Sequence, residues 1–405
     1  MRIKARLALA GVMCVALAGT FFATAGPSSA KTPATAAAAK ITYKNLSYKD
    51  FTLTYAAMKA LKPLATKGKG SVAVILPDTT SSTRYTEFDA PMLKTALTDA
   101  GLKSSQIIIQ NAQASDSTFI TDVQADITAG AKVIGIDPED SATGVKAEQL
   151  AAAAGVKTID YDRLTLGGAM SGKYYVSFNN VNVGVLLGKG LVSCVKAWKV
   201  SSPKVIVMRG APTDNNATLF ANGYLSVLNP YFNGKGWTNL AQPAGTWDPP
   251  TAETEFQQAF TANPSANALL SPNDENAAPI ITYLKTQGVK PNTFPVTGQD
   301  ATLVGIQNII SGYQCGTVYK PVFLEAQAAA ALAMYLRAGI TPPKTLINGT
   351  TQDTVNNIAV PSILETPEWV TPTTVEKTIV HDKFVPASQI CAGGYKADCT
   401  KYKIH

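Results

Sequence analysis

The chain has 405 residues, of which 46% are hydrophobic and 16% are charged, and its formal net charge is +7. This length exceeds one ordinary hydrophobic core and predicts two domains, and the apolar content excludes a disordered chain. The basic residues are spread along the sequence without a dense stripe, which argues against a nucleic-acid partner.

The first 30 residues have the pattern of an export signal. The basic start MRIKAR precedes the apolar run LALAGVMCVALAGTFFATA, and small residues offer cleavage near Ala25 or Ala30. We therefore expect an exported protein, extracellular or associated with the cell envelope. Two alternatives stay open: the run could remain as an anchor helix, because its length is close to that of a membrane span, or Cys14 could carry a lipid.

Four further cysteines follow this signal: Cys194, Cys315, Cys391 and Cys399. An even number in an exported chain predicts two disulfides, and four cysteines allow three pairings. Cys391 and Cys399 flank AGGYKAD, whose two glycines can turn the chain, so a local bridge between them is the easiest closure. That choice leaves Cys194 to pair with Cys315. Buried free thiols are the alternative.

Residues 31–70 are expected to hold a linker and one helix. The segment 31–40, KTPATAAAAK, is a low-complexity linker. In the following segment FTLTYAAMKALKPLA, apolar residues recur at helical spacing, which predicts an N-terminal helix that ends near Pro63.

From Ser71 onward, strand-like and helix-like segments alternate in two sets. The first run, SVAVILP, is continuously apolar, as expected for a strand that is buried on both faces. The predicted strands of the first set are 71–77, 106–112, 132–138, 156–163 and 173–180, with helices 88–101, 118–129 and 147–154. Those of the second set are 204–210, 237–244, 267–274, 294–300 and 315–321, with helices 181–198, 217–228, 251–263, 279–288, 302–312 and 322–339. This alternation predicts an α/β fold with two Rossmann-like lobes, each a doubly wound parallel sheet.

Polar clusters, several with an aromatic ring, follow the apolar runs in both predicted lobes. They are Thr83-Arg84-Tyr85, Tyr161-Asp162-Arg163, Asn179-Asn180, Asp214-Asn215-Asn216, Trp247, Asn273-Asp274, Gln299-Asp300 and Tyr319-Lys320. Each cluster alone could be a turn, a helix cap or a surface ion pair. Because ligands of parallel sheets bind beyond the carboxyl ends of the strands, the recurrence predicts one cleft. Carboxylate, amide and guanidinium groups with almost no histidine suit a neutral polyhydroxylated ligand.

The patterns of common enzymes are absent from the sequence. His381 and His405 are the only histidines, so the sequence offers few candidates for a Ser-His-Asp arrangement or for a metal site built from histidines. The phosphate-binding pattern G-x-x-x-x-G-K-[ST] and the paired C-x-x-C motif do not occur. We therefore predict no catalytic residue, no metal and no cofactor.

Nine segments, in this order, resemble those of the periplasmic sugar-binding proteins of ABC transporters, in particular the D-xylose-binding branch. They are LPDTTSSTRY, ITAGAKVIGIDP, IDYDR, YVSFNNVNVG, MRGAPTDNNATLF, SPNDENA, VTGQDATLVGIQ, TVYKP and VPSILETP. The resemblance covers roughly residues 70–385. It departs from the family at Tyr85, where a tryptophan is usual, and at Asn179, where an aspartate is usual. The segment 41–66 and the cysteine-bearing C-terminal region are additional to the family pattern.

The resemblance implies a type I periplasmic binding protein whose two lobes close over one sugar. The chain would cross between the lobes near Asn179–Asn180, Tyr319–Lys320 and Asn348–Val360. The first lobe would hold residues 71–179 with 321–350, and the second lobe 180–320 with 351–405. By residue-by-residue match, the side chains that hydrogen-bond the sugar would be Arg84, Asp162, Arg163, Asp214, Asn216, Asn273, Asp300 and Lys320. Trp247 and Tyr85 would supply aromatic faces.

The function implied by the resemblance is capture of a monosaccharide, D-xylose in the first place, by a monomer that delivers it to an ABC permease. Another aldose (glucose, ribose or arabinose) and presentation of the sugar to a chemosensory or sensor-kinase partner are the alternatives. A secreted sugar-modifying enzyme is a further one.

Overall fold

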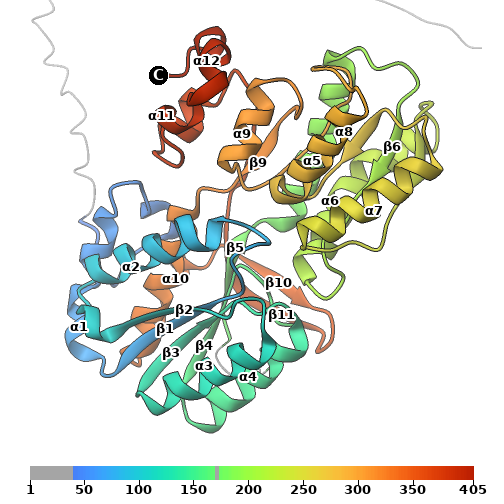
Figure 1. Cartoon of the computed structure of the whole chain (residues 1–405). Helices are drawn as coiled ribbons and strands as arrows, with labels where there is room; N and C mark the ends of the chain where they lie inside the picture. Colours follow the sequence, from blue (N-terminus) through green and yellow to red (C-terminus); the bar gives the residue numbers. More distant parts are fainter. Residues whose placement is uncertain (1–39, 169–172) are drawn as a thin grey trace, which may run out of the picture. The chain divides into compact units, whose positions relative to one another are not determined.

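The computed structural model describes residues 40–168 and 173–405, and residues 41–405 form one compact unit (Figure 1). The predicted export signal, Cys14 and the linker up to residue 39 lie outside the described residues. Within the described part of the chain, none of the helices combines the length and the apolar character that a membrane crossing requires.

The first lobe is built on a seven-stranded sheet with the order β10-β11-β5-β4-β3-β1-β2. All neighbours pair in parallel except β10 and β11, which form an antiparallel hairpin. The strands are β1 (Ser71–Leu76), β2 (Ile107–Asn111), β3 (Ala131–Ile136), β4 (Lys157–Tyr161), β5 (Tyr175–Phe178), β10 (Gly349–Asp353) and β11 (Ile358–Glu365).

Strand β1 shows why this sheet is covered on both faces. Side chains alternate along a strand, so Val72 and Val74 enter one apolar cluster and Ala73 and Ile75 enter another. The first cluster lies under the helices α2 (Ala90–Asp99) and α10 (Val322–Arg337), and the second under α3 (Asp116–Thr128) and α4 (Ser141–Ala153). The continuous apolar run SVAVIL therefore forms a central parallel strand, as predicted.

The N-terminal segment packs on this lobe, but its predicted helix is wrong in detail. Tyr55 has a left-handed φ of 54°, a 3-10 helix follows at Ala56–Leu61, and α1 spans Lys62–Lys67. Pro63 therefore lies in the first turn of a helix instead of near its end. A proline lacks the backbone N–H that is unpaired in a first turn anyway, so this position suits it.

The second lobe has the same plan around a smaller sheet. Its strands are β6 (Lys204–Val207), β7 (Thr238–Ala241), β8 (Ala268–Leu270), β9 (Thr317–Tyr319) and β12 (Glu368–Val370). The order β7-β6-β8 is parallel, and single parallel bridges at Val296 and Gln299 connect β8 to β9, which pairs with β12. The predicted strand 294–300 is thus reduced to these two bridges.

Helices cover both faces of this smaller sheet. They are α5 (Asn180–Ala197) and α6 (Asn215–Phe232) on one face, with α7 (Pro249–Ala262) and α8 (Asp274–Thr286) on the other, and α9 (Leu303–Ile310) beside α8.

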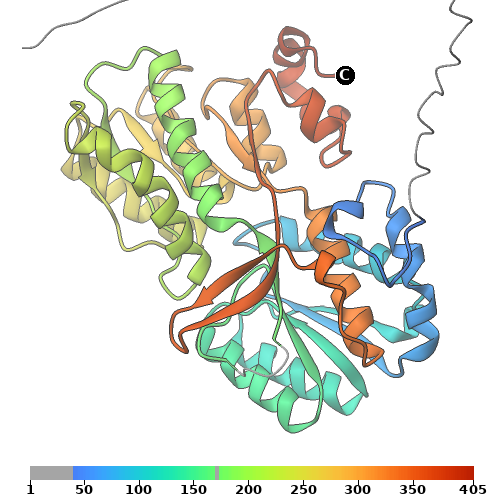
Figure 2. The same ribbon diagram turned by 180° about the vertical axis from the view of Figure 1, so that it is seen from behind.

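The chain crosses between the lobes after β5, after β9 and after β11. The first two crossings lie where they were expected, whereas the third lies at Glu365–Glu368 and not at Asn348–Val360. The assignment of residues 351–365 to the second lobe is therefore wrong. Their strand β11 pairs in parallel with β5, and Figure 2 shows the orange-red hairpin β10–β11 continuing the sheet of the first lobe. Burial of Ile363 on one face and Val360 on the other fixes β11 there.

Both predicted disulfides are confirmed. Cys194 in α5 is bonded to Cys315, which lies two residues before β9, and Cys391 is bonded to Cys399. The second bridge lies in the C-terminal tail, which we define as residues 371–405. The tail contains a π-helical turn at Glu376–Val380 and the short helices α11 (Ala387–Ile390) and α12 (Lys396–Tyr402).

Glu365, at the end of β11, gives the fold a pH-dependent component of stability. Burial raises the pKa of this carboxyl from 4.5 to about 7, and its Oε1 atom has no hydrogen-bond partner among the described residues. Because the pKa of the folded state is the higher one, the carboxyl favours folding below about pH 4.5, and this contribution is lost as the pH rises through 7.

We expect Glu365→Gln to flatten the dependence of the unfolding free energy on pH between about 4.5 and 7, by up to about 1.4 kcal/mol per pH unit. Urea unfolding of both proteins at several pH values measures this difference. Glu368→Gln, which replaces an exposed glutamate of the same crossing, is the control and should keep the wild-type slope. A Glu365→Gln protein with an unchanged slope would show that this carboxyl is already ionised in the folded protein.

Candidate ligand-binding site

A polar pocket lies between the two lobes, beyond the carboxyl ends of their strands. Nine of the ten predicted site residues line it: Tyr85, Asp162, Arg163, Asp214, Asn216, Trp247, Asn273, Asp300 and Lys320. Further lining comes from Ser81, Ser82, Phe220 and Gln299. Residues up to 235 positions apart in the chain (Tyr85 to Lys320) therefore line one pocket. This agrees with the rule that ligand sites of parallel sheets follow the strands.

Asp162 and Asp300 hold corresponding positions in the two lobes. Asp162 directly follows β4, and Asp300 directly follows the bridging segment 296–299 that lies between β8 and β9. Both have a left-handed backbone, with φ of 55° for Asp162 and 87° for Asp300. Non-glycine residues adopt this conformation rarely, and aspartate is among the residues that tolerate it best. The turn aims each carboxylate into the pocket.

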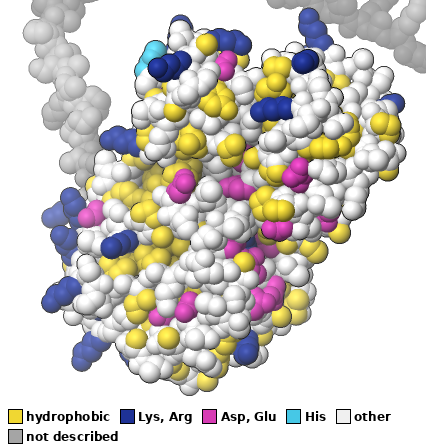
Figure 3. Space-filling model, viewed as in Figure 1, with side chains coloured by type: hydrophobic (Ala, Val, Ile, Leu, Met, Phe, Trp, Pro, Cys, Tyr) yellow, Lys and Arg dark blue, Asp and Glu magenta, His cyan; other side chains and the backbone are white. Residues whose placement is uncertain are grey.

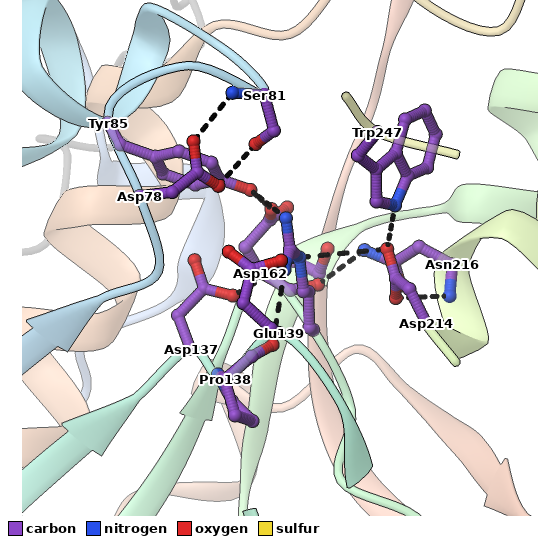
Figure 4. Close-up of polar contacts among 12 residues, drawn as sticks. Asp78, Ser81, Tyr85, Asp137, Pro138, Glu139, Asp162, Asp214, Asn216 and Trp247 are labelled. Atoms are coloured by element: carbon purple, nitrogen blue, oxygen red, sulfur yellow. Dashed lines mark hydrogen bonds and ion pairs between the residues drawn. The ribbon is translucent and has the colours of Figure 1, made fainter. Parts of the chain in front are cut away.

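Arg163 is the cation on the first-lobe side. Its guanidinium donates to the carbonyl of Pro138 at 3.2 Å and to Glu139 at 3.1 Å, and its Nε lies 3.6 Å from both Asp137 and Asp214. Figure 4 shows these groups converging from the ends of neighbouring strands. Arg163 thus joins a first-lobe cluster to Asp214 of the second lobe.

Lys320 is the cation on the second-lobe side. Its Nζ lies 2.9 Å from Asp300 Oδ1, and Asp300 Oδ2 accepts a hydrogen bond from Ser82 of the first lobe at 3.1 Å. Asn273 donates to the carbonyl of Ser81 at 3.0 Å, again across the lobes. The structure is therefore a closed form, in which direct hydrogen bonds join the two walls of the pocket.

Trp247 and Tyr85 present aromatic rings to the pocket. The indole Nε1 of Trp247 donates to Asp214 at 3.0 Å, and its ring lies so close to Gly210 that a Cβ there would be 2.1 Å from it. The hydroxyl of Tyr85 donates to Asp162 at 2.8 Å. Both rings are thus held by a carboxylate, with flat apolar surface left over (Figure 4).

Arg84 differs from the expectation. Its side chain is 1% exposed and lies behind the pocket wall, where the guanidinium donates to Asp89 and Glu325 at 2.6 Å and to Asp162 at 3.2 Å. In this closed form it holds Asp162 in place and does not face the pocket. The partner Glu325 lies in α10, 241 positions further along the chain, so no local sequence pattern could indicate it.

The sequence interpretation also missed Ser81, Ser82 and Phe220. Ser81 and Ser82 belong to the same loop as Tyr85, and Phe220 lies one helical turn after Asn216 on α6. A search for all polar residues of each strand-end loop would have found the serines. Phe220 could have been found only from the i, i+4 spacing on a helix whose first turn points at the pocket.

Charges of both signs line the pocket: three carboxylates, Asp162, Asp214 and Asp300, and two cations, Arg163 and Lys320. Burial would raise the pKa of Asp162, but Arg84, Lys320 and Arg163 together lower it to about 2, so this carboxylate is ionised. Burial raises the pKa of Asp214 despite Arg163, and it raises that of Glu139 to about 7. On the face shown in Figure 3, Asp and Glu side chains gather across the middle, while Lys and Arg lie mostly at the margins. Paired charges of both signs favour a neutral polar ligand.

The comparisons with known proteins agree with this geometry. Residues 72–341 match the periplasmic binding protein domain. The chain belongs to the periplasmic binding protein family. The expected type I fold with its parallel-sheet lobes is thereby confirmed.

Relatives of this periplasmic binding protein include sugar-binding proteins from several bacteria. The D-xylose-binding periplasmic protein of Escherichia coli (strain K12) is 32% identical over 289 residues, which cover 71% of this chain and 83% of that protein. The multiple sugar-binding periplasmic receptor ChvE of Rhizobium radiobacter is 31% identical over 346 residues, covering 81% and 94%. A carbohydrate transporter solute binding protein from Chloroflexus aurantiacus, in complex with D-glucose, has a TM-score of 0.68 at 28% identity and covers 79% of this chain and 98% of that chain. These relatives are binding proteins and a receptor, in agreement with the prediction of a protein that is not an enzyme.

Proposed function

We propose that this chain is an exported solute-binding protein that captures a monosaccharide, D-xylose in the first place, and delivers it to the permease of an ABC transporter. The observation that carries the proposal is the pocket itself. Ion-paired carboxylates, three amides and three aromatic rings from both lobes surround one small space.

The chemistry of the lining suits a sugar. A hydroxyl both donates and accepts, so it can bridge a carboxylate and a cation such as Asp300 and Lys320. Gln299 Oε1 is buried without a hydrogen-bond partner among the described residues, and a ligand hydroxyl would supply the donor that it lacks. The ring of Trp247 offers a flat surface to the C–H face of a pyranose.

Capture would follow from closure of the lobes about the three crossings. Asp162, Arg163 and Tyr85 would bind one side of the sugar, and Asp214, Asn216, Trp247, Asn273, Asp300 and Lys320 the other. Hydrogen bonds to charged groups contribute roughly 1.5–3 kcal/mol each when water is excluded. A few of them, less the cost of ordering the ligand, give a dissociation constant in the micromolar range or below.

The relatives support D-xylose first and keep other aldoses as competitors. Two of them bind, by their descriptions, xylose or multiple sugars, and a structural relative holds D-glucose. The description of ChvE as a receptor supports a second role, presentation of the bound sugar to a sensor. We propose a monomer, since each chain supplies both walls of its pocket.

A sugar panel tests the proposal. We expect D-xylose to raise the unfolding midpoint of the mature protein by mass action, more than glucose, ribose, arabinose or galactose do. Isothermal titration calorimetry then gives the dissociation constant and a stoichiometry of about one per chain. A larger shift with another aldose would reassign the sugar, and no shift with any of them would refute the function. Mass spectrometry of the incubated sugar separates binding from catalysis, because an enzyme would yield a new product.

A further inference from the structure

The C-terminal tail, residues 371–405, packs on the second lobe. It follows β12 and lies against α9, where the side-chain amide of Gln307 donates to the carbonyls of Gln389 at 3.3 Å and Ile390 at 3.4 Å. Apolar tail residues share a buried cluster with Ile306 and Ile310 of α9. The Cys391–Cys399 disulfide closes the end of the tail covalently. These contacts make the tail a part of the second lobe.

The tail also contacts the first lobe, because its apolar residues share the buried cluster with Phe88 and with Val322 of α10. The ring of Phe384 stacks on that of Phe88, with centroids 3.7 Å apart and an angle of 18° between the planes. Phe88 belongs to the helical turn Tyr85–Asp89, which directly follows the loop after β1 and carries the pocket residue Tyr85. Both phenylalanines are buried, with 6% and 4% of their surfaces exposed. Figure 1 shows the tail helices α11 and α12 beside α9.

The same tail cluster supports two further pocket segments. Tyr319, which directly precedes Lys320, packs edge-on against Phe384 at 4.9 Å and donates from its hydroxyl to Asp382 at 3.0 Å. Ala301, which directly follows Asp300, is fully buried in the cluster. Phe384 thus contacts two segments that carry pocket residues, the turn Tyr85–Asp89 of the first lobe and Tyr319–Lys320 of the second, and shares a buried cluster with Ala301.

We propose that the C-terminal tail is a latch across the lobes and that Phe384 is a positioning residue for ligand binding. The inference rests on the proposed function. The stack on Phe88 and the pocket hydrogen bonds are both made in the closed form, so opening that separates the turn Tyr85–Asp89 from α9 must also expose two buried rings. A contact outside the pocket thereby raises the population of the closed form and lowers the apparent dissociation constant.

The competing interpretation is that the tail only covers the apolar face of α9. In that case, loss of the Phe384 ring would lower the stability of the second lobe, and the lobes would open and bind as before. The two interpretations differ in a quantity that needs no ligand, namely the radius of gyration of the sugar-free protein in solution.

The test uses the full mature chain with Phe384→Ala, Phe88→Ala, the double variant and Phe384→Leu. We expect the dissociation constant of either single alanine variant to rise by about three- to tenfold, the factor that corresponds to one aromatic stack. The double variant should be no weaker than the worse single one, because both changes remove the same contact. Phe384→Leu, which keeps apolar volume but no ring, should lie in between. Small-angle scattering should show a larger radius of gyration for Phe384→Ala than for the wild type, both without sugar.

Phe260→Ala is the matched control. Phe260 stacks on Phe256 within the second lobe, with centroids 5.5 Å apart, so its loss removes a stack of the same kind that does not cross the lobes. We expect a lower unfolding midpoint with an unchanged affinity and an unchanged radius of gyration.

A Phe384→Ala protein with the affinity and the radius of gyration of the wild type would overturn the latch. If the wild type bound no sugar at all, the proposed function would fail, and the comparison of radii would still decide the latch. Should Phe384→Ala not fold, Phe88→Ala and Phe384→Leu carry the same comparison.

Discussion

Replacing Asp300 by asparagine is expected to weaken sugar binding by about 100-fold or more in a protein that still folds. Asp300 is 4% exposed, forms the ion pair with Lys320 at 2.9 Å and accepts the hydrogen bond from Ser82 across the lobes. The neutral amide leaves the buried ammonium of Lys320 without its countercharge and removes an acceptor from the pocket. Losing one partner of a buried charge pair costs about 2–5 kcal/mol of binding, so we expect an affinity about 100-fold lower or worse.

Asparagine is chosen because it tolerates the left-handed φ of 87° at this position, where alanine would add backbone strain. Calorimetry with D-xylose, or with the aldose that the panel identifies, measures the loss, and circular dichroism checks the fold. Asp116→Asn, an exposed change of the same kind at the start of α3, should bind as the wild type does. Near-normal affinity of Asp300→Asn would remove this residue from the site.

Replacing Arg84 by methionine is expected to cause the largest loss of stability. The guanidinium is shared by three buried carboxylates, those of Asp89, Asp162 and Glu325. Methionine fills part of the volume of the arginine side chain, but the three buried carboxylates then repel one another without a cation between them. Breaking one buried ion pair costs about 3–5 kcal/mol of unfolding free energy. At pH 8 we expect Arg84→Met to lose about 5 kcal/mol or more.

The loss should be smaller at pH 5. Burial holds the pKa of Glu325 well above its usual value even beside Arg84, and the carboxyl takes up a proton more readily once the cation is gone. A folded-state pKa above the unfolded one stabilises the fold at low pH, and that contribution disappears as the pH rises. Urea unfolding at pH 5 and pH 8 measures both values.

Arg337→Met is the matched control for this pH dependence. Arg337 is also buried, but its hydrogen bonds go to the carbonyls of Gly70 and Ala65, which do not titrate. We expect a loss of stability that is nearly the same at both pH values. Adding Glu325→Gln to Arg84→Met should recover part of the stability at pH 8. An Arg84→Met protein as stable as the wild type would show that these carboxylates are protonated already.

The sequence was informative wherever a local pattern decides the structure. The apolar run SVAVIL forms a central strand, as its composition predicts. Residues at the strand ends line the pocket, because a parallel sheet places all its carboxyl ends at one edge. It failed where the deciding contact is distant. Whether Arg84 faces a ligand depends on Glu325, far along the chain, and the hairpin β10–β11 is recognisable only from its pairing with β5. Pro63 was misplaced because proline both ends and begins helices, and the packing of the N-terminal segment selects between the two.

The Cys194–Cys315 disulfide has a consequence for the effect of proteolysis on the second lobe. Cys194 lies in the first helix after the chain enters the second lobe, and Cys315 lies just before the strand from which it leaves, 121 positions later. The bond therefore closes most of the second lobe into a covalent ring. A protease that cuts one peptide bond inside this ring leaves both fragments attached, so a nicked molecule keeps its two halves at the same place. In the exported protein that we propose, a single cut would then open the backbone at one point without the loss of a lobe.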